Sequence, residues 1–384
     1  MKILAIYFKA GSGISVFYQR IVCELARNAG VEIDVLSDRE PMEKFVGVRN
    51  QYHLPYSSRM QSWYRKFLRW FGTTPISDRW SRKAYEMVAK DYDVVIAFMA
   101  TSQLTPVVCG RFISEKLGCK FASYAVDAIP APGGWTRKKS EFRGKARILA
   151  RNLASADYVA SSNPHMLEYQ LTVFPNKPTL RSDVLFTPSP DQYYNYPPSN
   201  ELLFLYTGSL YGLRNPDHFF KAFKRLLKVY PQARVEIVGI KCKLRNIEKI
   251  LSPEELTHVS RGEHTSDLEP LFRRATVLVD IDADLEKDPF LSSKIVTYMK
   301  VNRVILSETG KITPSREIFA GLNTVVQCDH NEDSLYEGML RAIEVAGSNP
   351  DFSEREPIIK EFSIEQVSAK FYRGLQEICA SKKE

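Results

Sequence analysis

The chain has 384 residues, with 53 Lys and Arg against 45 Asp and Glu, for a net charge of +8. This length exceeds the size at which a single hydrophobic core stops growing, roughly 250–300 residues, so we expect two domains. No run of 18 or more apolar residues occurs, which excludes a membrane-spanning helix, and the six scattered cysteines indicate reduced thiols in a cytoplasmic protein.

The positive charge is concentrated in the first half of the chain. Residues 1–185 hold 27 basic against 16 acidic side chains, whereas residues 186–384 hold 26 against 29. A basic half beside a near-neutral half suggests an anionic surface or an anionic acceptor as partner. No zinc-ligand spacing, RNA-binding aromatic motif or helix-turn-helix pattern accompanies the charge, so we expect no nucleic-acid partner.

The chain begins with a short apolar strand, Met1–Phe8, too weakly flanked for a signal peptide. A loop with Gly11 and Gly13 leads into a helix. A dinucleotide fingerprint would need a third glycine at position 16, which Val16 occupies, so this loop is poor evidence for NAD. A tight strand–helix turn is the alternative interpretation of the two glycines.

Strand and helix signals then alternate through the first half, a pattern typical of a parallel sheet with crossover helices. The expected strands are Val31–Leu36, Asp93–Phe98, Lys120–Val126 and Ala156–Ser161. Asp127 follows the third of these, and ligands of open α/β sheets bind beyond the carboxyl ends of strands. Asp127 is therefore the best-placed acid of this half, although a turn cap would have the same pattern.

Two basic segments favour contact with a membrane surface. Between Arg59 and Phe71, aromatic residues share one helical face and basic residues another, as in interfacial helices. The residues expected to contact the membrane are Trp63, Arg65, Lys66, Phe67, Arg69 and Trp70. Residues 137–147 add six basic side chains against one acid. The alternative is that the aromatic face packs on the protein's own core.

The proline-rich stretch Thr187–Asn200 is the best linker candidate, and a second crossing is expected within Gly347–Glu356, before a closing helix near Ile364–Cys379. The predicted domains are therefore residues 1–185, completed by about 357–384, and residues 186–356.

The second half opens with a strand, a glycine loop and a helix. The apolar run Leu202–Tyr206 leads into a loop with Gly208, Ser209 and Gly212, followed by Arg214. Asn215 is the expected N-cap and Pro216 the first helical residue. Glycines let a backbone approach a ligand closely, and arginine binds phosphate oxygens in pairs. The apolar stripe of the helix is formed by Phe219, Phe220, Phe223, Leu226, Leu227 and Tyr230.

A second segment, Phe290–Leu306, predicts an anion site at a helix start. Ser292 is a good N-cap, and Lys294 adds a positive charge at the same end of the helix. Ile295, Met299 and Asn302 recur at helical spacing before a buried strand that begins at Val304. The alternative is an ordinary capped helix whose lysine faces water.

Together the two segments resemble the donor-binding domain of GT-B fold glycosyltransferases, most closely glycosyltransferase family 4. The resemblance implies an α/β fold of two Rossmann-like domains that face each other across a cleft, with a C-terminal helix returning to the first domain. It places the donor diphosphate and ribose near Gly208, Ser209, Arg214, Ser292, Ser293, Lys294 and Thr297, and the nucleobase near His264. Gly11, Gly13 and Asp127 would lie on the acceptor side.

The chain departs from the family pattern at two positions. The family carries two glutamates separated by seven residues, where this chain has Pro289 and Thr297. Threonine can bind a ribose hydroxyl but lacks the two carboxylate oxygens. One of Asp282, Asp284, Glu286 and Asp288 could replace the first acid, or these could form a solvated acidic loop. The family's cleft histidine has no counterpart between His53 and His165.

The resemblance implies transfer of a sugar from a nucleotide diphosphate to a hydroxyl of a lipid-linked glycan, with retention of configuration. The expected nucleotide is UDP, with GDP and dTDP as alternatives. Arg214 and Lys294 would stabilise the leaving diphosphate in place of a metal, and Asp127 would position the acceptor. The setting would be bacterial surface polysaccharide synthesis at the cytoplasmic membrane face. The alternatives are a nucleotide-sugar 2-epimerase, which needs no acceptor, and an inactive scaffold, which releases no nucleotide.

Overall fold

The computed structural model describes residues 1–8, 15–40, 45–56, 70–100, 103–136, 138–173, 180–239 and 246–381. The chain forms two compact units, one of Met1–Pro188 with Ser363–Glu384 and one of Ser189–Phe362. The chain thus returns to the first unit at Ser363, after helix α14 (Glu356–Glu361).

The first unit contains a seven-stranded sheet in the order β3-β2-β1-β4-β5-β6-β7, in which all pairings between neighbours are parallel. Strand β4 reads Val-Val-Ile-Ala-Phe-Met and is buried throughout, as expected for a parallel strand covered on both faces. The strands are β1 Lys2–Tyr7, β2 Glu32–Ser37, β3 Asn50–His53, β4 Val94–Met99, β5 Lys120–Ala125, β6 Tyr158–Ser161 and β7 Arg181–Val184.

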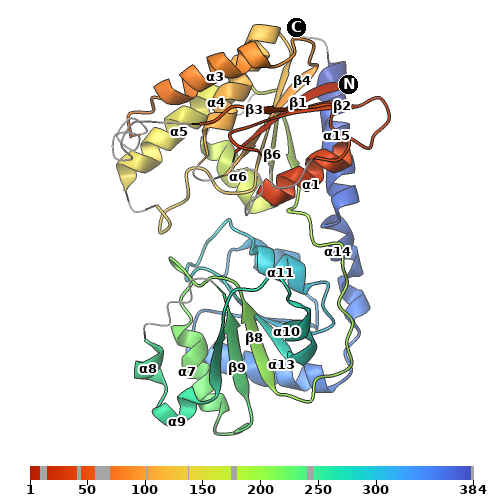
Figure 1. Cartoon of the computed structure of the whole chain (residues 1–384). Helices are drawn as coiled ribbons and strands as arrows, with labels where there is room; N and C mark the ends of the chain where they lie inside the picture. Colours follow the sequence, from red (N-terminus) through yellow and green to blue (C-terminus); the bar gives the residue numbers. More distant parts are fainter. Residues whose placement is uncertain are drawn as a thin grey trace. The chain divides into compact units, whose positions relative to one another are not determined.

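Helices cover both faces of this sheet (Figure 1). Helices α1 and α15 share one apolar core with one face, and α3, α4 and α5 pack on the other. Phe371 of α15 is fully buried and contacts the rings of Phe98, Tyr124 and Tyr158. The helices are α1 Ser15–Leu25, α3 Pro75–Met87, α4 Thr105–Leu117, α5 Lys139–Leu153, α6 Pro164–Val173 and α15 Ile364–Ala380.

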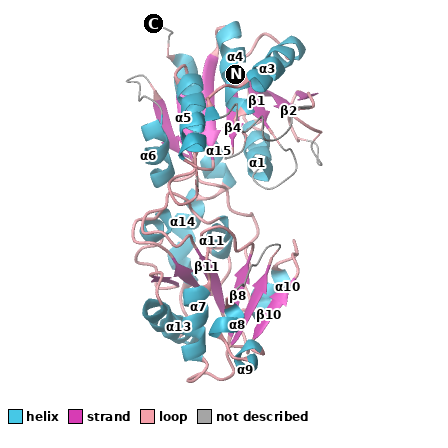
Figure 2. Ribbon diagram, turned by 90° about the vertical axis from the view of Figure 1, so that its left-hand side faces the viewer, coloured by secondary structure: helices cyan, strands magenta, loops and turns pink. Residues whose placement is uncertain are grey.

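The second unit contains a six-stranded parallel sheet in the order β10-β9-β8-β11-β12-β13. Figure 2 shows α7 and α13 on one side of this sheet and α10 on the other. The strands are β8 Leu203–Thr207, β9 Arg234–Val238, β10 Val259–Gly262, β11 Val277–Ile281, β12 Val304–Glu308 and β13 Val325–Cys328. The helices are α7 Asp217–Leu226, α8 Ile247–Ile250, α9 Pro253–Leu256, α10 Glu269–Arg274, α11 Ser293–Tyr298, α12 Pro314–Ile318, α13 Glu332–Gly347, the 3-10 turn η1 Phe352–Arg355, and α14.

A buried arginine fixes the segment between α11 and β12. Arg355 is fully buried and donates to main-chain oxygens of Tyr298, Val301, Arg303 and Thr324. Burial lowers the pKa of its guanidinium to about 9, opposed by the charge of Glu354. The carbonyl groups after α11, which has only six residues, are thus paired although the chain there is irregular.

Removal of the Phe371 side chain tests the place of the terminal helix in the first unit. Phe371→Ala should destabilise that unit by about 3–5 kcal/mol, because the large cavity lies at the centre of its core. Hydrogen exchange of the β4 and β5 amides measures the loss locally. Gln376→Ala, on the exposed face of the same helix, is the control and should change stability by less than about 0.5 kcal/mol. If the β4 and β5 amides exchanged equally slowly in both variants, this packing of Phe371 would be contradicted.

Candidate functional site

The predicted donor residues of the second unit gather at the carboxyl ends of strands β8 and β11. Gly208 directly follows β8, and Asp282 follows β11. The two loops are joined by a main-chain hydrogen bond of 3.0 Å from Asp284 to Leu213. Because ligands of parallel sheets bind at this edge, the arrangement is a candidate ligand site.

Position 208 favours glycine, because the Lys294 side chain occupies the space that a Cβ atom would need there. A Cβ atom at Gly208 would lie 2.9 Å from Cδ of Lys294, and the backbone there has φ +119°. Both facts favour glycine. The Gly208 amide donates to the Val238 carbonyl at 2.7 Å.

The ammonium group of Lys294 pairs with the buried carboxylate of Asp280. Its Nζ lies 3.2 Å from Oδ1 of Asp280 and 2.9 Å from Oγ of Ser292, and Ser292 in turn donates to the same Asp280 oxygen at 2.8 Å. Burial lowers the pKa of Lys294, and the charge of Asp280 acts in the opposite direction. The ammonium group therefore has a counter-ion before any ligand arrives.

Arg214 is the second cation of the site. Its guanidinium lies over the Tyr211 ring, 5.2 Å from the centroid. Burial acts to lower the pKa of Arg214, but the nearby Tyr211, Asp282 and Asp280 raise it. Arg214 is thus a fixed positive charge near both aspartates.

Asp282 is 3% exposed and accepts hydrogen bonds of 3.1 Å from Thr309 and Ser315. Burial, together with the neighbouring Asp280, raises its pKa to about 7, against the effect of Arg214 and Lys294. We refer to Arg214, Lys294, Asp280 and Asp282 as the charge quartet.

Two predicted helix starts differ from the structure. Ser292 stands at the N-cap position of α11 as predicted, but its side chain accepts from no main-chain amide of the helix: the hydroxyl donates to Asp280 and accepts from Lys294 Nζ. Helix α7 begins at Asp217 and not at Pro216, while Asn215 accepts from the Asp217 amide at 3.3 Å. With α11 only six residues long, side-chain charges dominate the site, not a helix start.

Asn302 lies outside α11, contrary to the helical spacing seen in the sequence. The helix ends at Tyr298, and the Asn302 side chain instead accepts from the Tyr196 amide. Local spacing extended the predicted helix by one turn, whereas tertiary hydrogen bonds end it.

The remaining predicted donor residues differ in their exposure. Ser209 is half-buried and Ser293 is exposed. Thr297 donates to the main-chain oxygen of Ser293 at 3.3 Å, within its own helix. His264 is exposed in the loop after β10. Their contact with a nucleotide stays a prediction.

The acidic loop after β11 is not uniformly solvated. Asp282 and Asp288 are buried, whereas Asp284 and Glu286 are exposed. Strand-like pairing between Lys287 and Ile312 anchors the loop on the segment after β12. Two of the four acids therefore belong to the interior of the unit.

In the first unit, Asp127 follows β5 and is half-buried. Its charge acts with burial to raise the pKa of Tyr18, so the two side chains are near each other. Trp70 lies beneath Lys138, whose Nζ is 5.1 Å from the ring centroid. The other predicted residues of this half, namely Gly11, Gly13, Trp63, Arg65, Lys66, Phe67 and Arg69, lie outside the described residues.

Sequence analysis missed two buried carboxylates at this edge of the sheet, Asp280 and Glu308, and the half-buried His330. Asp280 was hidden inside an apolar strand run, where a lone acid is itself the signal of a buried partner. Glu308, 1% exposed at the end of β12, contacts His330 Nδ1 at 3.1 Å. Burial lowers the pKa of His330, but Glu308 outweighs this effect and raises it.

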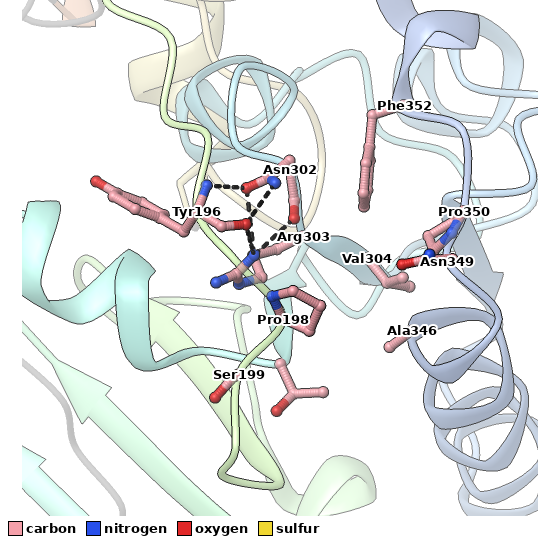
Figure 3. A pocket seen from close by; sticks show the side chains of 11 residues that line it. Tyr196, Pro198, Ser199, Asn302, Arg303, Val304, Ala346, Asn349, Pro350 and Phe352 are labelled. Atoms are coloured by element: carbon pink, nitrogen blue, oxygen red, sulfur yellow. Dashed lines mark hydrogen bonds between the residues drawn. The ribbon is translucent and has the colours of Figure 1, made fainter.

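A cavity of about 210 Å³ lies at the opposite, amino end of the same sheet (Figure 3). Arg303 at its wall donates to main-chain oxygens of Tyr196, Pro197 and Asn302. The predicted donor residues lie elsewhere, and the charged group of this wall is already bound internally. The lining residues are Tyr196, Pro198, Ser199, Thr276, Asn302, Arg303, Val304, Ala346, Asn349, Pro350 and Phe352.

Within the described ranges, no group of three or more His, Cys, Asp or Glu side chains is arranged to hold a metal ion. None of the described helices has both the length and the apolar character needed to cross a bilayer.

No protein-family model and no curated protein matches the sequence. Solved structures do. HepE of Anabaena in complex with UDP superposes with a TM-score of 0.68 at 14% identity, over 98% of this chain and 100% of that one. The lipopolysaccharide outer core galactosyltransferase WaaB gives 0.65 at 14% identity, over 98% and 99%. A UDP-N-acetylglucosamine 2-epimerase gives 0.56 at 12% identity, over 97% and 94%. The two parallel sheets and these likenesses confirm the predicted fold, two Rossmann-like units of the GT-B type.

Proposed function

We propose that this protein is a glycosyltransferase that moves a sugar from a nucleotide diphosphate to a hydroxyl acceptor. The observation that carries the proposal is the pair of cations, Arg214 and Lys294, beside Gly208 at the carboxyl edge of the second sheet. Cations fixed at such an edge suit a diphosphate, and the similar HepE is known with UDP.

The proposed reaction requires stabilisation of a leaving group. The acceptor oxygen forms a bond to the anomeric carbon as the bond from that carbon to the phosphate oxygen breaks, and the electron pair remains on the diphosphate. The proton of the acceptor hydroxyl is released to solvent. Arg214 and Lys294 would stabilise the charge that develops on the diphosphate. Asp127 is the proposed positioning group for the acceptor, and retention of configuration stays part of the proposal.

A 2-epimerase is the second candidate, and the likeness to a solved UDP-N-acetylglucosamine 2-epimerase favours it. Such an enzyme would convert the donor without an acceptor. The third candidate is an inactive scaffold, favoured by Pro289 and Thr297 where the resembling family has glutamates. The scaffold would neither convert a donor nor release nucleotide.

Nucleotide binding is the first expected outcome. UDP, GDP or dTDP at 100 times its dissociation constant should raise the free energy of unfolding by about 2.7 kcal/mol, a clear rise in melting temperature. Thermal denaturation with each diphosphate, in the presence and absence of EDTA, measures it. We expect one diphosphate to act, and to act equally with EDTA, because the proposed site uses side-chain cations. No shift with any of them would support the scaffold.

The contribution of Lys294 is best tested in a background without its buried partner. Lys294→Met alone would leave Asp280 buried without a counter-ion and cost about 3–5 kcal/mol of stability. Lys294→Met combined with Asp280→Asn removes both charges. Compared with Asp280→Asn, the double variant should lose about 100-fold or more in transfer rate, because one stabilising charge at the leaving group is gone.

Lys287→Met is the matched control and should retain transfer, because Lys287 is an exposed lysine in the loop between β11 and α11. Equal turnover by a well-folded double variant and by Asp280→Asn would remove the basis for assigning Lys294 to the site.

We also propose that the acceptor is carried on a lipid and that the protein works at the cytoplasmic face of the membrane in surface polysaccharide synthesis. Helix α5 presents the exposed basic side chains Lys139, Arg143 and Arg147 at four-residue intervals, while Ile148 and Leu149 are buried on its other side. This face adds to the uneven charge of the sequence and would suit an anionic leaflet.

Charge reversal on α5 should weaken membrane binding. Lys139→Glu with Arg143→Glu is expected to reduce binding to phosphatidylglycerol vesicles at least about tenfold, since each basic residue near an anionic surface contributes about 1 kcal/mol. Co-sedimentation with vesicles measures it. Lys221→Glu with Lys228→Glu, exposed residues of the second unit, changes the net charge equally and should have little effect. Equal loss in both double variants would show that only net charge matters.

A further inference from the structure

The cations of the candidate site already have buried counter-ions. Asp280 is fully buried and Asp282 is 3% exposed, so water solvates neither carboxylate appreciably. Asp280 contacts Lys294 directly, and both aspartates act electrostatically on Arg214. With all four groups ionised, the charge quartet has no net charge. A diphosphate that binds Lys294 must therefore displace or share an existing ion pair.

The position of Asp280 makes it the direct competitor for Lys294. One oxygen, Oδ1, accepts from both Lys294 and Ser292. The other, Oδ2, is buried and has no hydrogen-bond partner among the residues that the structure describes. Strand β11 otherwise carries apolar side chains, and its register pairs Asp280 with Ser307 on β12. A strand of this kind gains nothing in packing from a carboxylate, because a buried charge is costly unless paired.

A second aspartate strengthens the effect but is itself held elsewhere. Asp282 accepts from the hydroxyls of Thr309 and Ser315 and so is fixed to the segment after β12. It contributes negative potential without a direct contact to Lys294. Asp280 is therefore the group whose charge most directly opposes an anion at Lys294.

We propose that Asp280 is a positioning residue that holds Lys294 in the empty site and competes with the diphosphate for it, so that the nucleotide diphosphate is bound weakly and released readily. This inference rests on the proposed function, since it concerns the same site. In the bound state, the diphosphate places negative charge beside the Asp280 carboxylate, and the repulsion lowers its affinity. Product release limits the turnover of many enzymes, so weaker binding of the diphosphate product favours turnover.

The test is the sign of the change in affinity for Asp280→Asn. Asparagine keeps the size of the side chain and an oxygen that accepts from Ser292 and Lys294, but removes the charge. We expect UDP, or whichever diphosphate the wild type binds, to bind about tenfold more tightly, with the change mostly in the dissociation rate. Uridine, which lacks phosphate, should bind equally to both proteins. Titration calorimetry and stopped-flow dissociation measure the two quantities.

A structural role alone would give the opposite sign, because a loosened site binds every ligand more weakly. The matched control is Glu236→Gln, which removes a half-buried carboxylate on strand β9 of the same sheet, paired with Arg274 at 3.3 Å. It should leave the affinity for UDP unchanged. If Asp280→Asn does not fold, Asp280→Thr keeps an accepting oxygen, suits a strand and has the same expected outcome.

The outcomes separate the two proposals. Binding by the wild type that Asp280→Asn leaves unchanged or weakens overturns the role of Asp280 and spares the proposed function. Tighter binding of both UDP and uridine also overturns it, because the effect would not be directed at the diphosphate. Failure of the wild type to bind any nucleotide diphosphate overturns the proposed function and this inference with it.

Discussion

The candidate site depends on one buried ion pair, between Asp280 in the centre of the second sheet and Lys294 at the start of α11. The pair holds the Lys294 stem close to Gly208, and both this stem and the positive φ at position 208 favour glycine there. A glycine, a lysine and an aspartate from three separate segments are thus required together. A change at any one of them affects the other two, since the space and the charge are shared.

The same pair explains how charged groups persist in this interior. A buried ammonium group is costly alone, and a buried carboxylate is equally costly, but each offsets the other when hydrogen-bonded. Ser292 completes the arrangement by donating to the same carboxylate oxygen. Asp282, whose pKa is raised to about 7, accepts hydrogen bonds from two hydroxyls. The site therefore holds its cations in place without a ligand, at the cost of lower affinity for an anion.

The sequence was sufficient for the elements whose signal is local. Strand β8 was predicted within one residue, because Leu202–Tyr206 is an unbroken apolar run before a polar loop. The placement of Lys294 near Arg214 followed from the family resemblance of the two segments that carry them. The contact of Lys294 with Asp280 was not predictable in this way, since it joins a helix start to a strand fourteen residues earlier and depends on the packing of both.

The errors at Ser292 and Asn302 have the same cause. A serine before a helical pattern predicts a cap, yet the Ser292 hydroxyl donates to the buried Asp280 carboxylate and accepts from the Lys294 ammonium group. An asparagine at helical spacing predicts another turn, yet its amide bonds to the segment around Tyr196. In both cases a tertiary polar partner, absent from the local pattern, determines where the side chain points.

The GT-B fold alone does not choose among the candidate functions, because both a galactosyltransferase and a 2-epimerase have similar structures. The choice depends on where the acids lie. In the resembling family, two glutamates face the donor, whereas this chain has Pro289 and Thr297 at those positions. The acids nearest the cations are instead buried: Asp280 lies on β11 and Asp282 directly after it. Carboxylates in that place bind cations of the protein rather than hydroxyls of a sugar. The donor would thus be held chiefly through its diphosphate, and sugar selection would depend on other groups, of which the exposed Asp284 and Glu286 lie in the adjoining loop.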